Sequence, residues 1–386
     1  MFCVANQQFA KSDQLPTGGL PFGKVPYHSP SYHLHNFSKA YRSWLLPYIK
    51  SRLLSKEFRP VLSFLYTDLS CNLDCHYCYS RGKRIPGMTM ETARAAVDWL
   101  GSVGCRVLAY MGGEPLMRKD FIVELTRYAA NRGFFVYLPT NGILLEEAFI
   151  DAIGEAGIAA VNLAVDAVDG YEGIPKYFGR IKRQFEYLVQ QEKKYGYITF
   201  LNINITSRNV MDVKQLTEIA HHYGIATDYH INEPPPIRYE EFGHEKDGAW
   251  ITDNEIREVN ELIDWLVEKE QEGYNMVNSV DHLKAMKSFI RNKPPAWQCK
   301  AGQMSMVIRL NGSFSPCFEL YSSEEDWGDI RRGSRFDSER LARIKEQCSR
   351  TCLSTCNYQV SHYSQSWLRC LQWVAKHAYT QFFGVS

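Results

Sequence analysis

The sequence has no apolar run approaching the roughly 20 residues that span a bilayer. Its N-terminus lacks the basic region and the apolar core of a signal peptide. The net charge is only +1, so the overall field does not attract nucleic acid. No internal repeat or low-complexity segment is present. These absences predict a cytoplasmic globular protein with no nucleic-acid partner.

Cysteine, in contrast, is plentiful. The chain has 11 cysteines, and nine of them fall into two groups, at 71–78 and at 299–370. In a chain without an export signal, clustered cysteines are expected to be reduced thiols or metal ligands, and not a disulfide framework. Both groups are therefore candidate metal sites.

The first group contains Cys71, Cys75 and Cys78, which follow a strand-like run at 61–66 with CxxxCxxC spacing. Three thiolates can hold three irons of a [4Fe–4S] cluster, and no fourth cysteine lies near in the sequence. One iron would remain open to a small molecule. The alternatives for three close cysteines are a zinc knuckle and part of a disulfide scaffold.

Strand-like and helix-like patterns alternate after this group, which predicts an α/β fold with a parallel sheet and chemistry at the C-terminal strand ends. Six units are too few for a closed eightfold barrel. The strand-like runs lie at 61–66, 106–111, 134–138, 160–165, 198–205 and 228–232. The predicted regions are an N-terminal extension (1–59), the βα units (60–235), a helical linker region (236–296) and a small Cys-rich domain with a C-terminal helix (297–386).

Met111-Gly112-Gly113-Glu114-Pro115 ends the second strand. Together with CxxxCxxC, this segment resembles the radical S-adenosylmethionine (SAM) superfamily. The resemblance implies an open six-unit (β/α)6 partial TIM barrel, in which SAM binds the open iron. An electron from a donor such as flavodoxin or ferredoxin would cleave SAM to a 5′-deoxyadenosyl radical, which would abstract hydrogen from the substrate.

The resemblance also implies roles for single residues. Glu114 would accept a hydrogen bond from the SAM amino group, and Tyr77 would lie near the adenine. We expect Gly112 and Gly113 to let the backbone approach the ligand, because they have no Cβ.

Weaker candidates close later strands and would contact the ribose or the carboxylate of SAM. Asn141 lies in a Thr-Asn-Gly segment like that of the family, and Asn204 shares one strand face with Asn202. Asp166 stands where relatives often have S-x-D-G, but here alanines replace the serine and the glycine. Asn141 could instead be a turn residue, and Asp166 a helix N-cap.

The second cysteine group begins with Cys299, Gly312 and Cys317, whose spacing resembles the CX9–15GX4C opening of SPASM and twitch auxiliary-cluster domains. Asn311-Gly312 predicts a two-residue hairpin turn between them. The resemblance and the cysteine count favour one auxiliary [4Fe–4S] cluster, although a second cluster and a zinc site remain alternatives. Its ligands would be Cys299, Cys317 and two of Cys348, Cys352 and Cys356.

The substrate is less determined. The first 60 residues are too short and too rich in Pro and Gly for a peptide-recognition domain, which favours a small-molecule or lipid-like substrate. A maturase of ribosomal peptides is the alternative, and a non-catalytic Fe–S redox or scaffold protein is an alternative of another class. Residues 37–56 are basic and amphipathic, which fits either a helix packed on the barrel or peripheral membrane contact.

Overall fold

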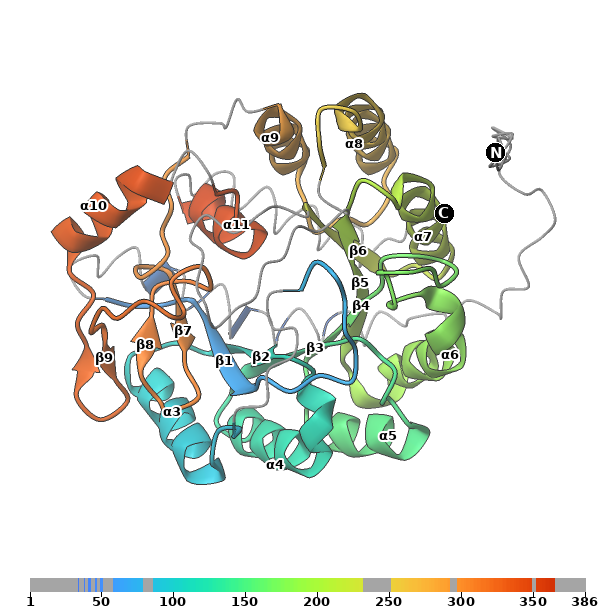
Figure 1. Cartoon of the computed structure of the whole chain (residues 1–386). Coiled ribbons are helices and arrows are strands. Elements are labelled where there is room, and N and C mark those ends of the chain that lie inside the picture. The colour runs from blue at the N-terminus through green and yellow to red at the C-terminus, as the bar shows by residue number, and fades with distance from the viewer. Residues whose placement is uncertain are drawn as a thin grey trace, which may run out of the picture.

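A curved, mostly parallel sheet carries helices along its outer side (Figure 1). The computed structural model describes residues 58–78, 86–231, 251–291, 297–348 and 352–364, with single residues between 34 and 50. Most of the basic segment 37–56 therefore lies outside the described residues. No helix in the described part of the chain is long and apolar enough to cross a membrane.

The six predicted strands are all present, and each pairs in parallel with its neighbour in the chain. They are β1 (Leu62–Asp68), β2 (Val107–Gly112), β3 (Phe135–Thr140), β4 (Ala160–Ala164), β5 (Ile198–Ile205) and β6 (Ala226–Ile231). The sheet does not close: β6 forms one edge and β8 (Phe314–Ser315) the other. This confirms the α/β partial barrel.

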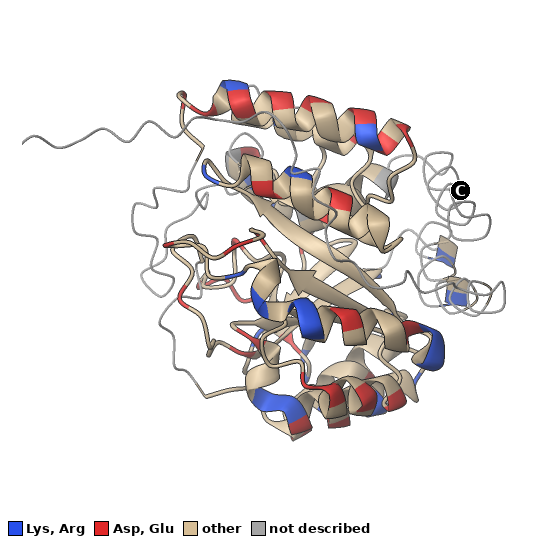
Figure 2. Ribbon diagram, turned by 90° about the vertical axis from the view of Figure 1, so that its right-hand side faces the viewer, with Lys and Arg blue, Asp and Glu red and all other residues tan. Residues whose placement is uncertain are grey.

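Helices follow the strands where the sequence has an apolar period near 3.6 residues. In α3 (Met90–Ser102), Thr89 caps the Thr92 N–H, and the buried positions Ala93, Ala96, Val97 and Leu100 form one face. The others are α4 (Lys119–Ala130), α5 (Glu147–Glu155), α6 (Phe178–Tyr195), α7 (Val210–His222), α8 (Ile256–Gln271) and α9 (Val280–Ile290). Figure 2 shows Lys, Arg, Asp and Glu along these helices, whereas the strands are almost free of them.

The C-terminal hairpin differs from the prediction in two ways. Its first strand, β7 (Ser305–Ile308), pairs in parallel with β1, so the hairpin extends the barrel sheet and does not stand apart from it. Its turn is longer than two residues, because Arg309 pairs with Ser313 and only Gly312 is left-handed (φ +84°). This is a three-residue loop closed by the Gly312 N–H to the Arg309 carbonyl.

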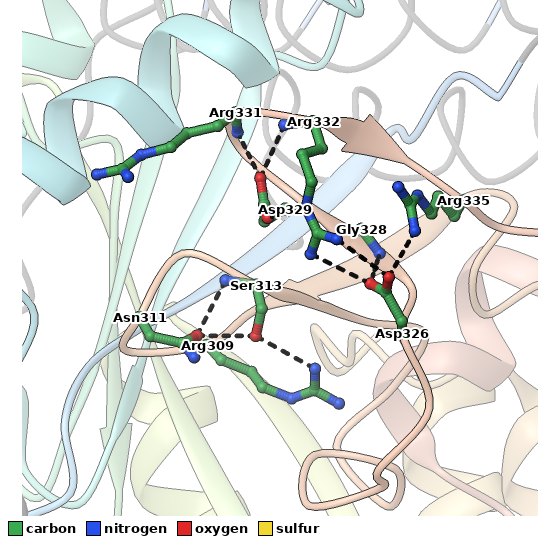
Figure 3. A network of polar contacts seen from close by, with 9 residues as sticks. All are labelled: Arg309, Asn311, Ser313, Asp326, Gly328, Asp329, Arg331, Arg332 and Arg335. Atoms are coloured by element: carbon green, nitrogen blue, oxygen red, sulfur yellow. Dashed lines mark hydrogen bonds and ion pairs between the residues drawn. The ribbon is translucent and has the colours of Figure 1, made fainter.

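A small ribbon of β9 (Gly328–Asp329) and β10 (Gly333–Ser334) follows the hairpin. Its turn is tied by Asp329, which accepts from the Arg331 and Arg332 N–H groups at 2.8 Å (Figure 3). Asp326 accepts from Arg335 Nη1 at 2.6 Å. These side chains are largely exposed, so each pair adds little stability and the network mainly fixes the local geometry.

The two faces of the sheet have separate apolar clusters. The outer cluster packs the helices against the strands. The inner cluster, which includes Phe64 and Tyr66, packs against Phe318, Tyr321 and α11 (Thr355–Ser364). The C-terminal region thus covers the β1 half of the inner face.

Candidate functional site

Hydrogen bonds join the segments that follow the C-terminal ends of β1, β2 and β3. The Gly113 N–H donates to the Asp68 carbonyl at 3.1 Å, and the Glu114 N–H donates to the Ser70 carbonyl at 2.8 Å. A Cβ on Gly112 would lie 1.8 Å from the Asp68 oxygen. The glycines therefore admit the backbone that leads into Cys71, and their role as a close approach to a ligand stays a prediction.

Glu114 is buried, with 2% of its surface exposed, and its side chain joins the end of β2 to the end of β3. Its Oε1 accepts from Leu116 N at 3.0 Å and Thr140 Oγ1 at 2.7 Å, and its Oε2 accepts from Asn141 N at 2.8 Å. Burial raises the pKa of Glu114, whereas these donors lower it. A carboxylate has about four acceptor positions, so one position remains on Oε2.

Asn141 joins the end of β3 to the cysteine loop. Its Nδ2 donates to Asn72 Oδ1 at 2.8 Å, and its Oδ1 accepts from Ile143 N at 3.1 Å. The second bond is the turn role that the sequence left open. The chain of contacts Asn72–Asn141–Glu114 therefore fixes the loop between Cys71 and Cys75 against the next two strand ends.

Asp166 is the centre of a second buried network. It is fully buried, and it accepts from the Tyr77 hydroxyl, from Lys176 Nζ at 2.9 Å and from Asn204 N at 2.8 Å. It does not cap a helix, because α6 begins only at Phe178 after Tyr177. The alternative of an N-cap was therefore wrong, and the predicted residues Tyr77, Asp166 and Asn204 lie together.

Lys176 was not identified from the sequence. It lies in the loop after β4, with its Nζ 5.1 Å from the centre of the Tyr77 ring. Burial lowers its pKa, but Asp166, Cys75 and Cys78 outweigh this and hold the pKa above its usual value. A lysine in an irregular loop gives no sequence signal, since only the folded loop brings it beside the cysteines.

The thiols of the first group lie beside both networks. Burial raises the pKa of Cys71 to about 11 and that of Cys75 to about 12, and Lys176 lowers both. Leu73 N–H points at Cys71 Sγ at 3.4 Å, a donor that favours a thiolate.

The donor chemistry of this group fits iron. Three thiols with a backbone N–H directed at one sulfur fit a cluster of thiolate-bound irons. Within the described ranges no three His, Cys, Asp or Glu side chains converge on one metal ion. A cubane does not require this, because each of its thiolates binds a different iron.

The second cysteine group surrounds Glu319 and Lys345. Burial is the main cause that raises the pKa of Cys299 to about 11; Lys345 lowers this pKa, and Glu319 and Cys348 raise it. Burial, Glu319 and Cys299 raise the pKa of Cys317. Ala301 N–H points at Cys299 Sγ at 3.5 Å. Lys345 interacts with the three sulfurs of Cys299, Cys317 and Cys348, an arrangement that again fits a thiolate-bound cluster.

Cys352 and Cys356 differ in their surroundings. Cys352 Sγ lies 3.9 Å from Glu319 Oε1 and accepts from Ser354 N at 3.4 Å. Cys356 packs on the inner face of the sheet, where burial and the Asp228 and Glu319 carboxylates raise its pKa. Cys356 therefore differs from the other described late cysteines in its contact with the inner face of the sheet, although Glu319 lies near it as well.

Comparison with known proteins finds a family match over part of the chain. The profile of the radical SAM superfamily matches residues 69–225. Fe-coproporphyrin III synthase of Methanosarcina barkeri is 30% identical over 172 residues, which are 43% of this chain and 42% of that protein. The chain therefore spans less than half the length of this curated relative.

Two further comparisons extend past the matched residues. PqqA peptide cyclase of Granulibacter bethesdensis is 26% identical over 262 residues, covering 64% of each chain. The structure titled native anSMEcpe with bound AdoMet and Cp18Cys peptide aligns with a TM-score of 0.56 at 17% identity, over 85% of this chain and all of that one. The second likeness shows a shared fold.

Proposed function

We propose that this chain, which matches the radical SAM superfamily over residues 69–225, is an enzyme that reductively cleaves SAM at the C-terminal edge of β1–β6. One observation carries the proposal: the contacts Asn72–Asn141–Glu114 bind the cysteine loop to the ends of β2 and β3. The first test is anaerobic reconstitution with iron and sulfide, reduction, and measurement of 5′-deoxyadenosine from SAM. A reconstituted protein that makes none would overturn the proposal.

In this proposal Cys71, Cys75 and Cys78 hold a [4Fe–4S] cluster that leaves one iron for SAM. When bound, the cluster supplies the electron that cleaves the sulfonium, and SAM supplies the radical that takes hydrogen from the substrate. The chain positions the reactants. A flavodoxin or a ferredoxin is the proposed source of the electron.

The binding residues have distinct tasks. Glu114 Oε2 keeps one acceptor position for the SAM amino group, while its other acceptors are bound by the chain. Lys176 and Asp166 form an ion pair that fixes the Tyr77 ring beside the cysteines. Asn204, whose N–H donates to Asp166, brings its side-chain amide to the same edge for the ribose or the carboxylate of SAM.

Replacing Glu114 with Gln tests the amino-group contact. A hydrogen bond between charged partners contributes about 1.5–3 kcal/mol, so SAM affinity should fall roughly 10- to 150-fold. Glu114→Ala is the poorer test, because it would leave three buried donors without an acceptor. Equilibrium dialysis with labelled SAM measures the affinity. Thr140→Val is the control, since it removes one donor but keeps the carboxylate. An unchanged dissociation constant in Glu114→Gln would refute the contact.

We also propose one auxiliary [4Fe–4S] cluster, held by Cys299, Cys317, Cys348 and Cys352. The support is that Glu319 lies close to all four cysteines and Lys345 close to the first three, whereas Cys356 packs on the inner face of the sheet. Such a cluster would either accept an electron from the substrate radical or hold the C-terminal region against β1.

Replacing Cys299 and Cys317 with Ala should remove roughly four irons per chain while the first cluster stays. SAM cleavage should continue in part, uncoupled from product. Because β7 pairs with β1, circular dichroism must show that the variant keeps its fold. Cys356→Ala is the matched control and should keep its iron. Zinc in the wild-type protein, or an equal loss of iron in Cys356→Ala, would contradict this ligand set.

The substrate class is inferred from the names of similar proteins and not from contacts in the site. One similar protein is named an Fe-coproporphyrin III synthase and another a PqqA peptide cyclase, so both a small molecule and a peptide fit the similar proteins. We retain a small-molecule or lipid-like biosynthetic substrate as the proposal and peptide maturation as the second candidate. A non-catalytic role is less favoured, because Glu114 and its partners are intact.

A further inference from the structure

The inner face of the sheet changes character between β3 and β4. On β1–β3 it is apolar, with Leu62, Phe64, Tyr66, Val107 and Ala109. On β4–β6 the same face bears polar side chains, namely Asn162, Asn202, Asn204, Asp228 and His230. Parallel strands covered on both faces are normally apolar throughout. The polar half, which we call the β4–β6 polar patch, therefore needs an explanation.

Strand register brings the members of the patch together. Asn202 pairs with Asp228, and Asn204 pairs with His230. His230 Nε2 lies 2.9 Å from Asn202 Nδ2 and 3.4 Å from Asp228 Oδ2. One end of the patch, at Asn204, reaches the Asp166 network of the proposed SAM site.

Two members of the patch, Asn162 and Asp228, have unused acceptors. Asn162 donates from Nδ2 to the Tyr137 hydroxyl at 2.5 Å, but its Oδ1 is buried without a donor in the described part of the chain. Asp228 Oδ1 is likewise buried without a donor among those residues. Only 2% of Asn162 and 9% of Asp228 are exposed. Buried acceptors of this kind are costly unless water or a ligand supplies donors.

We propose that the β4–β6 polar patch binds a hydrogen-bond donor group of the substrate, an ammonium or a hydroxyl. Asn162 Oδ1 and Asp228 Oδ1 are its acceptors, and the Asn202 and His230 side chains lie beside the Asp228 carboxylate. The patch lies on the inner face of the sheet, and the backbone N–H of its member Asn204 donates to Asp166. The inference rests on the proposed function, because it places the substrate next to the SAM site.

The negative charge of the patch disfavours an anionic ligand group. Asp228 is the carboxylate of the patch, and Lys176, the lysine of the Asp166 network, is paired with Asp166. A phosphate or carboxylate group would therefore meet a negative charge and two acceptors. An ammonium or hydroxyl group supplies the missing donors.

Calorimetric titration with small probes tests the patch directly. Ethanolamine supplies an ammonium and a hydroxyl, ethylene glycol supplies hydroxyls alone, and 1,2-dimethoxyethane has the same polar spacing but no donor. We expect the reconstituted, SAM-bound protein to bind ethanolamine or ethylene glycol with a dissociation constant of about 1 mM, as ligand size allows, and not to bind dimethoxyethane. Preference for ethanolamine would assign an ammonium, and equal binding of the first two would assign a hydroxyl.

Variants complete the test. Asp228→Asn and Asn162→Leu should each weaken probe binding about 10-fold or more, as expected for a lost hydrogen bond to a buried group. Glu155→Gln, an exposed carboxylate at the end of α5, is the charge-matched control and should bind normally. If Asp228→Asn does not fold, Asn162→Leu decides alone.

The inference is overturned if neither donor probe binds, if dimethoxyethane binds as well, or if the folded patch variants bind like the control. Those results would leave buried water as the partner of the two acceptors. 5′-Deoxyadenosine formation is measured on the same wild-type preparation. Cleavage of SAM without probe binding overturns this inference alone, whereas probe binding without cleavage overturns the proposed function alone.

Discussion

Replacing Cys71, Cys75 and Cys78 together with Ala should abolish 5′-deoxyadenosine formation and remove roughly four irons per chain. The thiols lie on one loop beside the Glu114 and Asp166 networks. Iron analysis and chromatography of the reaction products measure both losses.

A buried cysteine away from this loop provides the control. Cys105 is fully buried before β2, and Cys105→Ala should keep both iron and SAM cleavage. Retained SAM cleavage in the triple variant would refute the assignment of this group. Loss of iron without loss of cleavage would refute it equally.

Replacing Lys176 with Met should lower the free energy of unfolding by about 3–5 kcal/mol, because it leaves the Asp166 carboxylate buried without its cation. SAM affinity should fall as well, since the ion pair fixes Tyr77 and the loop over the cysteines. Denaturant unfolding measures the first effect and equilibrium dialysis the second.

A double variant separates the buried charge from the loss of packing. Asp166→Asn with Lys176→Met removes both charges, so it should be more stable than Lys176→Met alone. If both proteins unfold at the same denaturant concentration as the wild type, the ion pair has no structural role. If only the double variant recovers stability but SAM still binds weakly, the pair acts in positioning.

Local sequence patterns found the strands because a parallel strand buried on both faces is a short apolar run between breakers. β5 was predicted at 198–205 and lies at Ile198–Ile205. The prediction failed at the hairpin. Asn311-Gly312 indicated a two-residue turn, but the pairing of Arg309 with Ser313 sets a longer loop. The pairing of β7 with β1 joins segments about 240 residues apart, a contact that no local pattern contains.

Some features of the candidate site likewise follow from the sequence alone, and others follow only from the tertiary structure. The sequence by itself determined the cysteine spacing, the Gly-Gly-Glu segment and the order of the βα units, because covalent spacing and local periodicity encode them. Only the tertiary structure decided that Asp166 pairs with Lys176 and not with a helix terminus, that Cys356 turns to the inner face, and that the polar residues of β4–β6 meet. These contacts depend on strand register and on the loops that cross the sheet edge, which long-range packing fixes.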